Sequence, residues 1–342
     1  LEFRRVLFRS AQFAIVGKGS SVALSTFTQI ISKAQAGQLA PLHAVWGLGQ
    51  ISRTGHPVAR KHLVQTLSHQ VVELRANGAR TCGDIQISEA RDSLLKGLKD
   101  SSSRVVSLSA VALGRVASRG DQEVIQSLLE LAEGNVGESF QVAIRHSILS
   151  ALDRLATPEQ AVSWFKHPSP EVRMLGVLVL RRMEHPGVSS FLDDEDKLVR
   201  LEAIRALYDT SAVDSTAGAR LIELEYQNLP VYIQARLVVA AARWGNEAGF
   251  AQVLKMATDA TLDPRVQTLA LHGLQRWDNY PNMDPFLGSL RPSPHPREQA
   301  RALAAQHSSA YLNYLGQENR ADFLTLATEV TAPLGLSLDP AE

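Results

Sequence analysis

The stretch Ser169-Pro-Glu-Val-Arg-Met-Leu-Gly-Val-Leu-Val-Leu-Arg-Arg182 sets the pattern for most of the chain. Its first two residues favour the start of a helix. The Ser169 side chain can accept hydrogen bonds from unpaired backbone N–H groups, and Pro170 stands at the first helical position, where its missing N–H costs nothing. From Val172 onward, apolar or small residues recur four, seven and eight positions later, which places them on one helical face. The stretch therefore predicts an amphipathic helix.

The same spacing recurs along the chain. Further clear anchors, each followed by a small or apolar pair seven and eight residues later, are Val105, Ile144, Val199, Ile233 and Val266, and weaker ones are Ala40, Val72 and Pro296. Good N-cap residues stand three residues before five of the anchors, at Ser102, Ser169, Asp196, Asp263 and Ser293. Second amphipathic segments are expected between the anchored helices, at 88–98, 121–132, 158–165, 216–226 and 248–257.

A helix pair of about 30 residues that recurs about eight to nine times is typical of an α-solenoid. One pair cannot bury its apolar faces alone, so the pairs must stack, and the small residues let neighbouring helices approach closely. The sequence predicts an all-α fold, an α-solenoid of antiparallel helix pairs in a right-handed superhelix. We expect residues 11–342 to form a single repeat domain that is less regular from residue 278, where proline-rich connectors follow, with a further helix at 319–330.

The first ten residues need a separate interpretation. Leu1-Glu-Phe-Arg-Arg-Val-Leu-Phe-Arg-Ser10 resembles the translated library adapter found at the ends of many metagenomic reads. We therefore expect 1–10 to be a cloning or sequencing artefact and leave this segment out of the predicted fold. The chain is then expected to be a fragment that lacks its true N-terminus.

Composition favours some partners and excludes others. The 35 basic and 35 acidic side chains give a net charge of zero, which argues against a nucleic-acid partner and against a polybasic membrane attachment. The single cysteine, Cys82, cannot form an internal disulfide or a Cys-x-x-Cys pair. No run of about 18 apolar residues is present, so the sequence predicts no membrane span.

Motifs for catalysis are missing from the sequence. It contains no His-Glu-x-x-His, no Gly-x-Ser-x-Gly and no Cys/His pair with metal-ligand spacing, so we expect no catalytic residue, no metal and no cofactor. The acidic run from Asp193 to Asp196 is interpreted as a loop whose last residue caps the next helix. The tryptophans are interpreted as packing residues on apolar faces: Trp46, Trp164, Trp244 and Trp277.

The candidate binding residues are five arginines, called here the arginine ladder. They stand ten residues after five of the six clear anchors, at Arg115, Arg154, Arg182, Arg243 and Arg276, whereas the sixth unit has Asp209. In a regular stack, equivalent positions line up, so five guanidinium groups would form a stripe able to bind carboxylates or phosphates. The alternative is structural: cations in the last turn of a helix complement its dipole and bridge neighbouring repeats.

The units starting at Ser169 and at Leu198-Val-Arg-Leu-Glu-Ala-Ile-Arg-Ala-Leu207 resemble HEAT repeats, and the resemblance extends over most of the chain. A narrower resemblance rests on two segments. Ala40-Pro-Leu-His-Ala-Val-Trp-Gly-Leu-Gly-Gln-Ile51 and the stretch from Leu269 to Pro292 are similar to the HEAT region of large membrane-bound or secreted dehydrogenase-like proteins of Planctomycetes and Verrucomicrobia. Those proteins carry a propeller before this region and often a c-type cytochrome after it.

The resemblance implies a function for a parent protein rather than an activity of this segment. We expect a non-catalytic scaffold or protein-interaction segment of a larger, redox-related bacterial protein, whose partners are another protein or neighbouring domains of the same chain. The narrower resemblance implies an extracytoplasmic location. The alternative is a HEAT-fold enzyme, similar to a bilin lyase or a DNA glycosylase; a glycosylase is disfavoured by the zero net charge and the low aromatic content.

Overall fold

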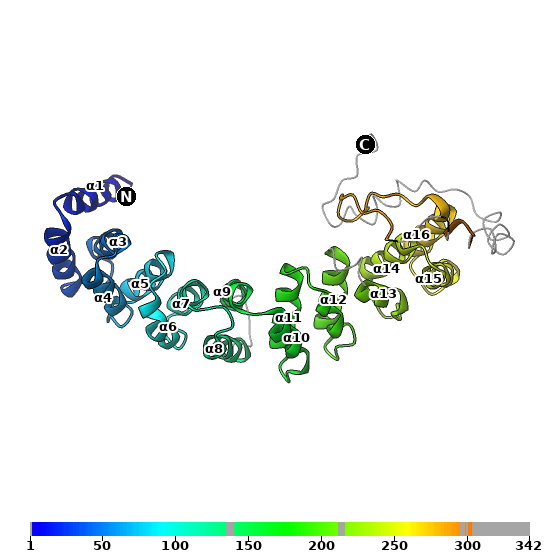
Figure 1. Ribbon diagram of the computed structural model, residues 1–342, viewed down its shortest axis with the longest axis horizontal. Coiled ribbons are helices and arrows are strands. Elements are labelled where there is room, and N and C mark those ends of the chain that lie inside the picture. Colours follow the sequence, from blue (N-terminus) through cyan, green and yellow to red (C-terminus); the bar gives the residue numbers. More distant parts are fainter. Residues whose placement is uncertain (1, 135–139, 211–215, 295–297, 299, 303–342) are drawn as a thin grey trace. The chain divides into compact units, whose positions relative to one another are not determined.

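The chain folds into short helices joined by turns (Figure 1). The computed structural model describes residues 2–134, 140–210, 216–294, 298 and 300–302. Within them, the predicted all-α fold of repeated helix pairs is confirmed, and the pairing of extended chain is limited to one isolated bridge, between Met283 and Leu290. The helix predicted at 319–330 lies outside the described residues.

Two compact units divide the chain, unit 1 at residues 1–175 and unit 2 at residues 176–342. That residues 11–342 act as one domain stays a prediction. The elements of unit 1 are α1 (Glu2–Gly17), α2 (Ser20–Ser32), α3 (Ala40–Arg53), α4 (Pro57–Thr66), α5 (Val72–Asp84), η1 (Ser88–Ala90), α6 (Arg91–Gly97), α7 (Ser103–Val116), α8 (Gln122–Glu133), α9 (Phe140–Leu155), α10 (Pro158–Ser163), η2 (Trp164–Lys166) and the start of α11 (Pro170–Arg182).

Four helices of unit 1, here called the row helices, pack one against the next: α3 on α5, α5 on α7 and α7 on α9. Glycines set their spacing. A Cβ built on Gly49 would stand 2.6 Å from Thr81 Cγ2, one on Gly83 would stand 2.8 Å from Ala112 Cα, and one on Gly114 would stand 2.6 Å from Ala151 Cα. Helix backbones in the row therefore approach more closely than any side chain at these positions would allow.

These contacts correct one predicted anchor. Ala112 and Ala151 each stand seven residues after their anchors, Val105 and Ile144, and Thr81 takes the same place in α5. The anchor of α5 is therefore Leu74, which is fully buried, and not Val72, which is 37% exposed. The prediction placed it two residues too early because Val72 and Leu74 both satisfy an apolar pattern.

Unit 2 continues the alternation of helices. Its elements are the rest of α11, then η3 (Pro186–Phe191), α12 (Lys197–Asp209), α13 (Thr216–Glu223), α14 (Val231–Trp244), α15 (Glu247–Thr258), α16 (Pro264–Gln275) and η5 (Trp277–Asn279). Helix α14 packs against α12, α13, α15 and α16. It is the centre of the unit, because every residue from Ile233 to Trp244 is buried.

The five predicted N-cap residues differ in the hydrogen bonds that their side chains form. Ser169, Asp196 and Asp263 each accept a backbone N–H at the start of their helices, as predicted. Ser102 occupies the N-cap of α7 without a side-chain cap. Ser293 differs, since its hydroxyl donates to the carbonyl oxygen of Arg243 at 2.7 Å.

Candidate functional site

The arginine ladder lies at helix C-termini, as its spacing predicted, but its members have different surroundings. In unit 1, Arg115 of α7 pairs with Asp84 of α5, so it bridges neighbouring repeats. Arg154, in the last turn of α9, is exposed and forms no ion pair or hydrogen bond with a described residue. Of these two arginines, Arg154 has the guanidinium that is open to a partner.

In unit 2, Arg182 near the end of α11 and Arg276 at the C-cap of α16 are exposed. Arg243 is 3% exposed, so its guanidinium does not lie on a surface stripe. It belongs to α14, which is surrounded by other helices. That the five arginines bind carboxylates or phosphates stays a prediction, and burial separates Arg243 from the other members.

In two helices a carboxylate occupies the ladder position, and both carboxylates form ion pairs with arginines. Once α5 is anchored at Leu74, its tenth position is Asp84, which pairs with Arg115 and lies 3.6 Å from Arg80. The corresponding residue of α12, Asp209, accepts from arginines of other helices. Acidic residues at this position therefore link helices.

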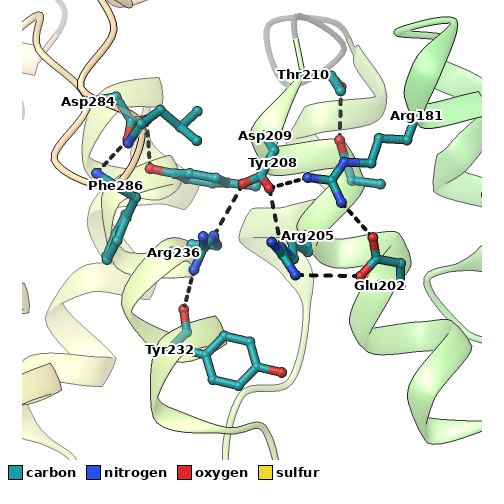
Figure 2. Close-up of polar contacts among 12 residues, drawn as sticks. Arg181, Glu202, Arg205, Tyr208, Asp209, Thr210, Tyr232, Arg236, Asp284 and Phe286 are labelled. Atoms are coloured by element: carbon teal, nitrogen blue, oxygen red, sulfur yellow. Dashed lines mark hydrogen bonds and ion pairs between the residues drawn. The ribbon is translucent and has the colours of Figure 1, made fainter. Parts of the chain in front are cut away.

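Asp209 is the centre of a polar network in unit 2 (Figure 2). Its carboxylate lies 2.8 Å from Arg181 of α11, 3.4 Å from Arg205 on its own helix and 3.3 Å from Arg236 of α14. Arg181 also pairs with Glu202 at 2.6 Å. Three guanidinium groups and two carboxylates thus join α11, α12 and α14, and charge-assisted bonds of this kind fix geometry strongly.

The network continues into the chain that follows η5. The Tyr208 hydroxyl donates to Asp284 at 2.7 Å, and the Arg236 guanidinium lies 5.0 Å from the centre of the Phe286 ring. Arg291 donates to the carbonyl oxygens of Tyr208 and Asp209 at 2.6 and 2.8 Å, which caps the C-terminus of α12. Burial and the neighbouring carboxylate raise the pKa of Tyr208. These bonds fasten the segment to the helices, a structural role.

The candidate binding site is a cavity of about 480 Å³ in unit 1, lined by α1, α3 and α5. Trp46, Arg53 and Arg80 are exposed side chains in its lining, and Gln50 lies between the first two on α3. The Oε1 atom of Gln50 is buried and has no hydrogen-bond partner among the described residues. Cavities of this size accept small molecules or a few residues of a peptide.

His43 and Trp46 form the aromatic part of the cavity. Their rings meet edge to face with centroids 4.7 Å apart, and His43 Nδ1 lies 3.0 Å from Gln12 Oε1. Burial lowers the pKa of His43, which favours its neutral form. The positive charge of the cavity therefore comes from arginines.

Trp46 departs from its prediction as a packing residue. It is 38% exposed, whereas Trp164, Trp244 and Trp277 are buried as predicted. The cavity itself was not predicted, because Arg53 and Arg80 belong to different helices at different positions relative to the anchors. Their proximity follows from how α3 and α5 pack, which spacing alone does not give.

Searches for two other kinds of site found none in the part of the chain that the structure describes. It contains no cluster of three or more His, Cys, Asp or Glu side chains placed to hold a metal ion. None of its helices combines the length and the apolar character needed to cross a membrane.

Comparisons with known proteins address the fold. Residues 60–148 match the family model of HEAT repeats. This range extends from within α4 to the first half of α9, and it contains both residues of one glycine contact of the row, Gly83 with Ala112. No curated protein matches the chain. A crystal structure of an engineered protein is similar over 96% of this chain and 91% of its own, at 18% identity and a TM-score of 0.39. The HEAT match supports a scaffold or interaction fold.

Proposed function

We propose that this chain is a non-catalytic scaffold that binds a protein partner, or neighbouring domains of a larger protein, through the row helices of unit 1. The observation that carries this proposal is the set of exposed Trp46, Arg53 and Arg80 on helices held at glycine-determined distances. Tryptophan and arginine are enriched among the residues that dominate binding energy at interfaces. Rigid HEAT repeats are well suited to hold such side chains at fixed positions.

The parent protein is proposed to be a redox-related bacterial protein located outside the cytoplasm. This part rests on the resemblance of residues 40–51 and 269–292 to the HEAT region of dehydrogenase-like proteins. Sequencing the gene on both sides of the region that encodes this chain tests it. A propeller-coding region upstream and a Cys-x-x-Cys-His motif downstream would support the proposal, and unrelated flanking regions would exclude it.

The scaffold proposal itself needs a separate test. The chain would be produced together with the flanking domains identified by sequencing, with a photo-reactive amino acid at position 154 or at position 145. Both sites are exposed on α9, and nine residues place them about half a turn apart. If a flanking domain binds the row helices, one of these two positions should cross-link to it several-fold more strongly than the other. Absence of cross-links from both faces would contradict the proposal.

Of the arginine ladder, exposed Arg154 on the row helix α9 enters this proposal, whereas the exposed Arg182 and Arg276 belong to unit 2. Replacing Arg154 with Gln is expected to weaken partner binding and leave the melting temperature unchanged. Replacing the buried Arg243 with Gln is expected to lower the melting temperature instead. If Arg154→Gln lowers the melting temperature as much as Arg243→Gln does, the ladder is purely structural.

A further inference from the structure

The cavity of unit 1 has an excess of positive charge in a chain whose net charge is zero. Its charged lining residues are Arg9, Arg53, Arg80 and Asp84. Asp84 is already engaged by Arg115 and lies 3.6 Å from Arg80. Arg53 forms no ion pair or hydrogen bond with a described residue, so its guanidinium is available to an anionic group.

The same surface continues along the row. A second hollow, of about 400 Å³, shares Arg80 with the first and is also lined by Arg104, Leu108 and Asn77. Arg104 is exposed, at the start of α7. Arg53, Arg80 and Arg104 therefore stand on three successive row helices, along two adjoining hollows. A ligand that uses both hollows must be longer than one small molecule.

The uncharged groups of the cavity restrict the ligand further. Gln50 lies between Trp46 and Arg53 along α3 and lines the cavity, and a side-chain amide can donate to and accept from a peptide backbone. The exposed ring of Trp46 offers an apolar surface beside Arg53, to which an apolar or aromatic side chain can bind.

From these observations we infer that the two hollows bind an extended acidic peptide segment of the partner. Its carboxylates lie at Arg53, Arg80 and Arg104, and an apolar side chain lies on Trp46. Arg9 of α1 also lines the cavity, but it lies in the segment 1–10 that is left out of the predicted fold. The inference therefore rests on α3, α5 and α7. It also rests on the proposed function, since it names the partner's chemistry.

Fluorescence anisotropy tests this inference on the full chain. The probe is a fluorescein-labelled peptide, Gly-Asp-Phe-Glu-Asp-Glu-Gly with an amidated end, and its counterpart carries Asn and Gln in place of Asp and Glu. The acidic peptide is expected to bind at least about tenfold more tightly, because its carboxylates form charge-assisted hydrogen bonds with the arginines. The uncharged amides of the counterpart accept only weaker ones. Inorganic phosphate is expected to compete weakly.

Single variants assign the site. Arg53→Gln is expected to weaken binding about tenfold, Trp46→Leu to weaken it several-fold, and the matched control Arg145→Gln to leave it unchanged, with all melting temperatures within about 1 °C because these exposed side chains add little to stability. Equal binding of both peptides, or no binding of the acidic one, would overturn the inference. So would competition by phosphate at the peptide's own affinity, or loss of binding in Arg9→Gln without loss in Arg53→Gln.

The outcome is separable from that of the scaffold proposal. If a flanking domain cross-links to α9 while the acidic peptide does not bind, only the assignment of the two hollows fails. If the peptide binds and no flanking domain cross-links, the hollows keep their ligand and the row-helix scaffold proposal fails.

Discussion

The closest of these glycine approaches to a neighbouring backbone, between Gly114 of α7 and Ala151 of α9, gives a quantitative prediction for Gly114→Ala. The added Cβ would stand 2.6 Å from Ala151 Cα and 3.0 Å from Ala151 Cβ, in each case measured to the backbone or to a side chain with no freedom to rotate away. Clearing the contact requires α9 to move by about 0.4–0.8 Å across a close-packed interface. Overpacking of this kind costs about 1–3 kcal/mol.

A second effect has the opposite sign. Alanine favours a helix interior over glycine by about 1 kcal/mol. The net expectation is destabilisation of unit 1 by about 1 kcal/mol, which lowers the melting temperature of a domain of this size by about 2–4 °C. The control is Gly134→Ala at the C-cap of α8, where the backbone is right-handed and the new Cβ would lie 3.6 Å from the Glu130 carbonyl oxygen. This change is expected to be neutral within about 0.5 kcal/mol.

Cys82 makes the assay specific to unit 1. It is the chain's only thiol and is fully buried in α5, so its reaction with a chromogenic disulfide reports opening of that unit. Urea titrations followed by thiol reactivity and by circular dichroism would give the free energy of unfolding of each variant. If Gly114→Ala were as stable as Gly134→Ala or more stable, the helices would be farther apart than described and the reasoning would be refuted.

Three further predictions concern buried polar groups. Burial raises the pKa of the Cys82 thiol to about 12, so we expect no reaction with iodoacetamide at pH 8 in native protein and complete reaction in guanidinium; rapid native alkylation would contradict this. Hydrogen bonds from Arg75 hold the pKa of Asp100 below its ordinary value, so Asp100→Asn should destabilise unit 1 by about 1–3 kcal/mol at pH 7. That loss should shrink as the pH of the urea titrations falls below about 4, because the unfolded chain then gains a proton that the native carboxylate, with its lowered pKa, gains only at lower pH; a constant difference would exclude the ion pair as its cause. Tyr208→Phe removes the donor to Oδ2 of the buried Asp284, whose Oδ1 still accepts from the backbone N–H groups of Phe286 and Leu287, and should lower the free energy of unfolding of unit 2 by about 1–3 kcal/mol, followed by tryptophan fluorescence; an unchanged value would show that water replaces the hydroxyl.

The sequence predicted the helix pairs because their signals are local. A cap at Asp196 and the proline at Pro264 act on the first turn of their own helices, so spacing along the chain was enough to find them. The anchor of α5 was misplaced because register between helices depends on which residues meet across an interface. Gly83 settles that register only once its contact with Ala112 is known.

The cavity and the network of unit 2 could not be predicted for a related reason. Each depends on side chains from three or more elements, and on whether particular polar atoms have a hydrogen-bond or ion-pair partner. Gln50 looks like any polar residue on a helix until its Oε1 atom is seen to lack a donor. Asp209 was visible as an exception at the ladder position, yet its three arginine partners lie on α11, α12 and α14.

The segment from 284 to 291 has a structural role in unit 2. Asp284 and Arg291 belong to the stretch that resembles dehydrogenase-associated HEAT regions, and in this fold they fasten the chain to Tyr208 and to the C-terminus of α12. That role is structural and would suit any HEAT protein that returns its chain over α12. These contacts close unit 2, and the proposal of a redox parent rests on the sequence resemblance, which the gene's flanking regions test.

The ladder position shows which arginines remain available for a partner. In unit 1, Arg115 pairs with Asp84 of the preceding row helix, whereas Arg154 occupies the same position one helix later and forms no ion pair with a described residue. If an acidic residue at the ladder position of unit 2 also paired with a ladder arginine, Asp209 would pair with Arg182 or Arg243. It pairs with Arg181 and Arg236 instead. The sequence can therefore identify an acidic residue that pairs with an arginine, and the packing of each repeat determines which arginine it pairs with.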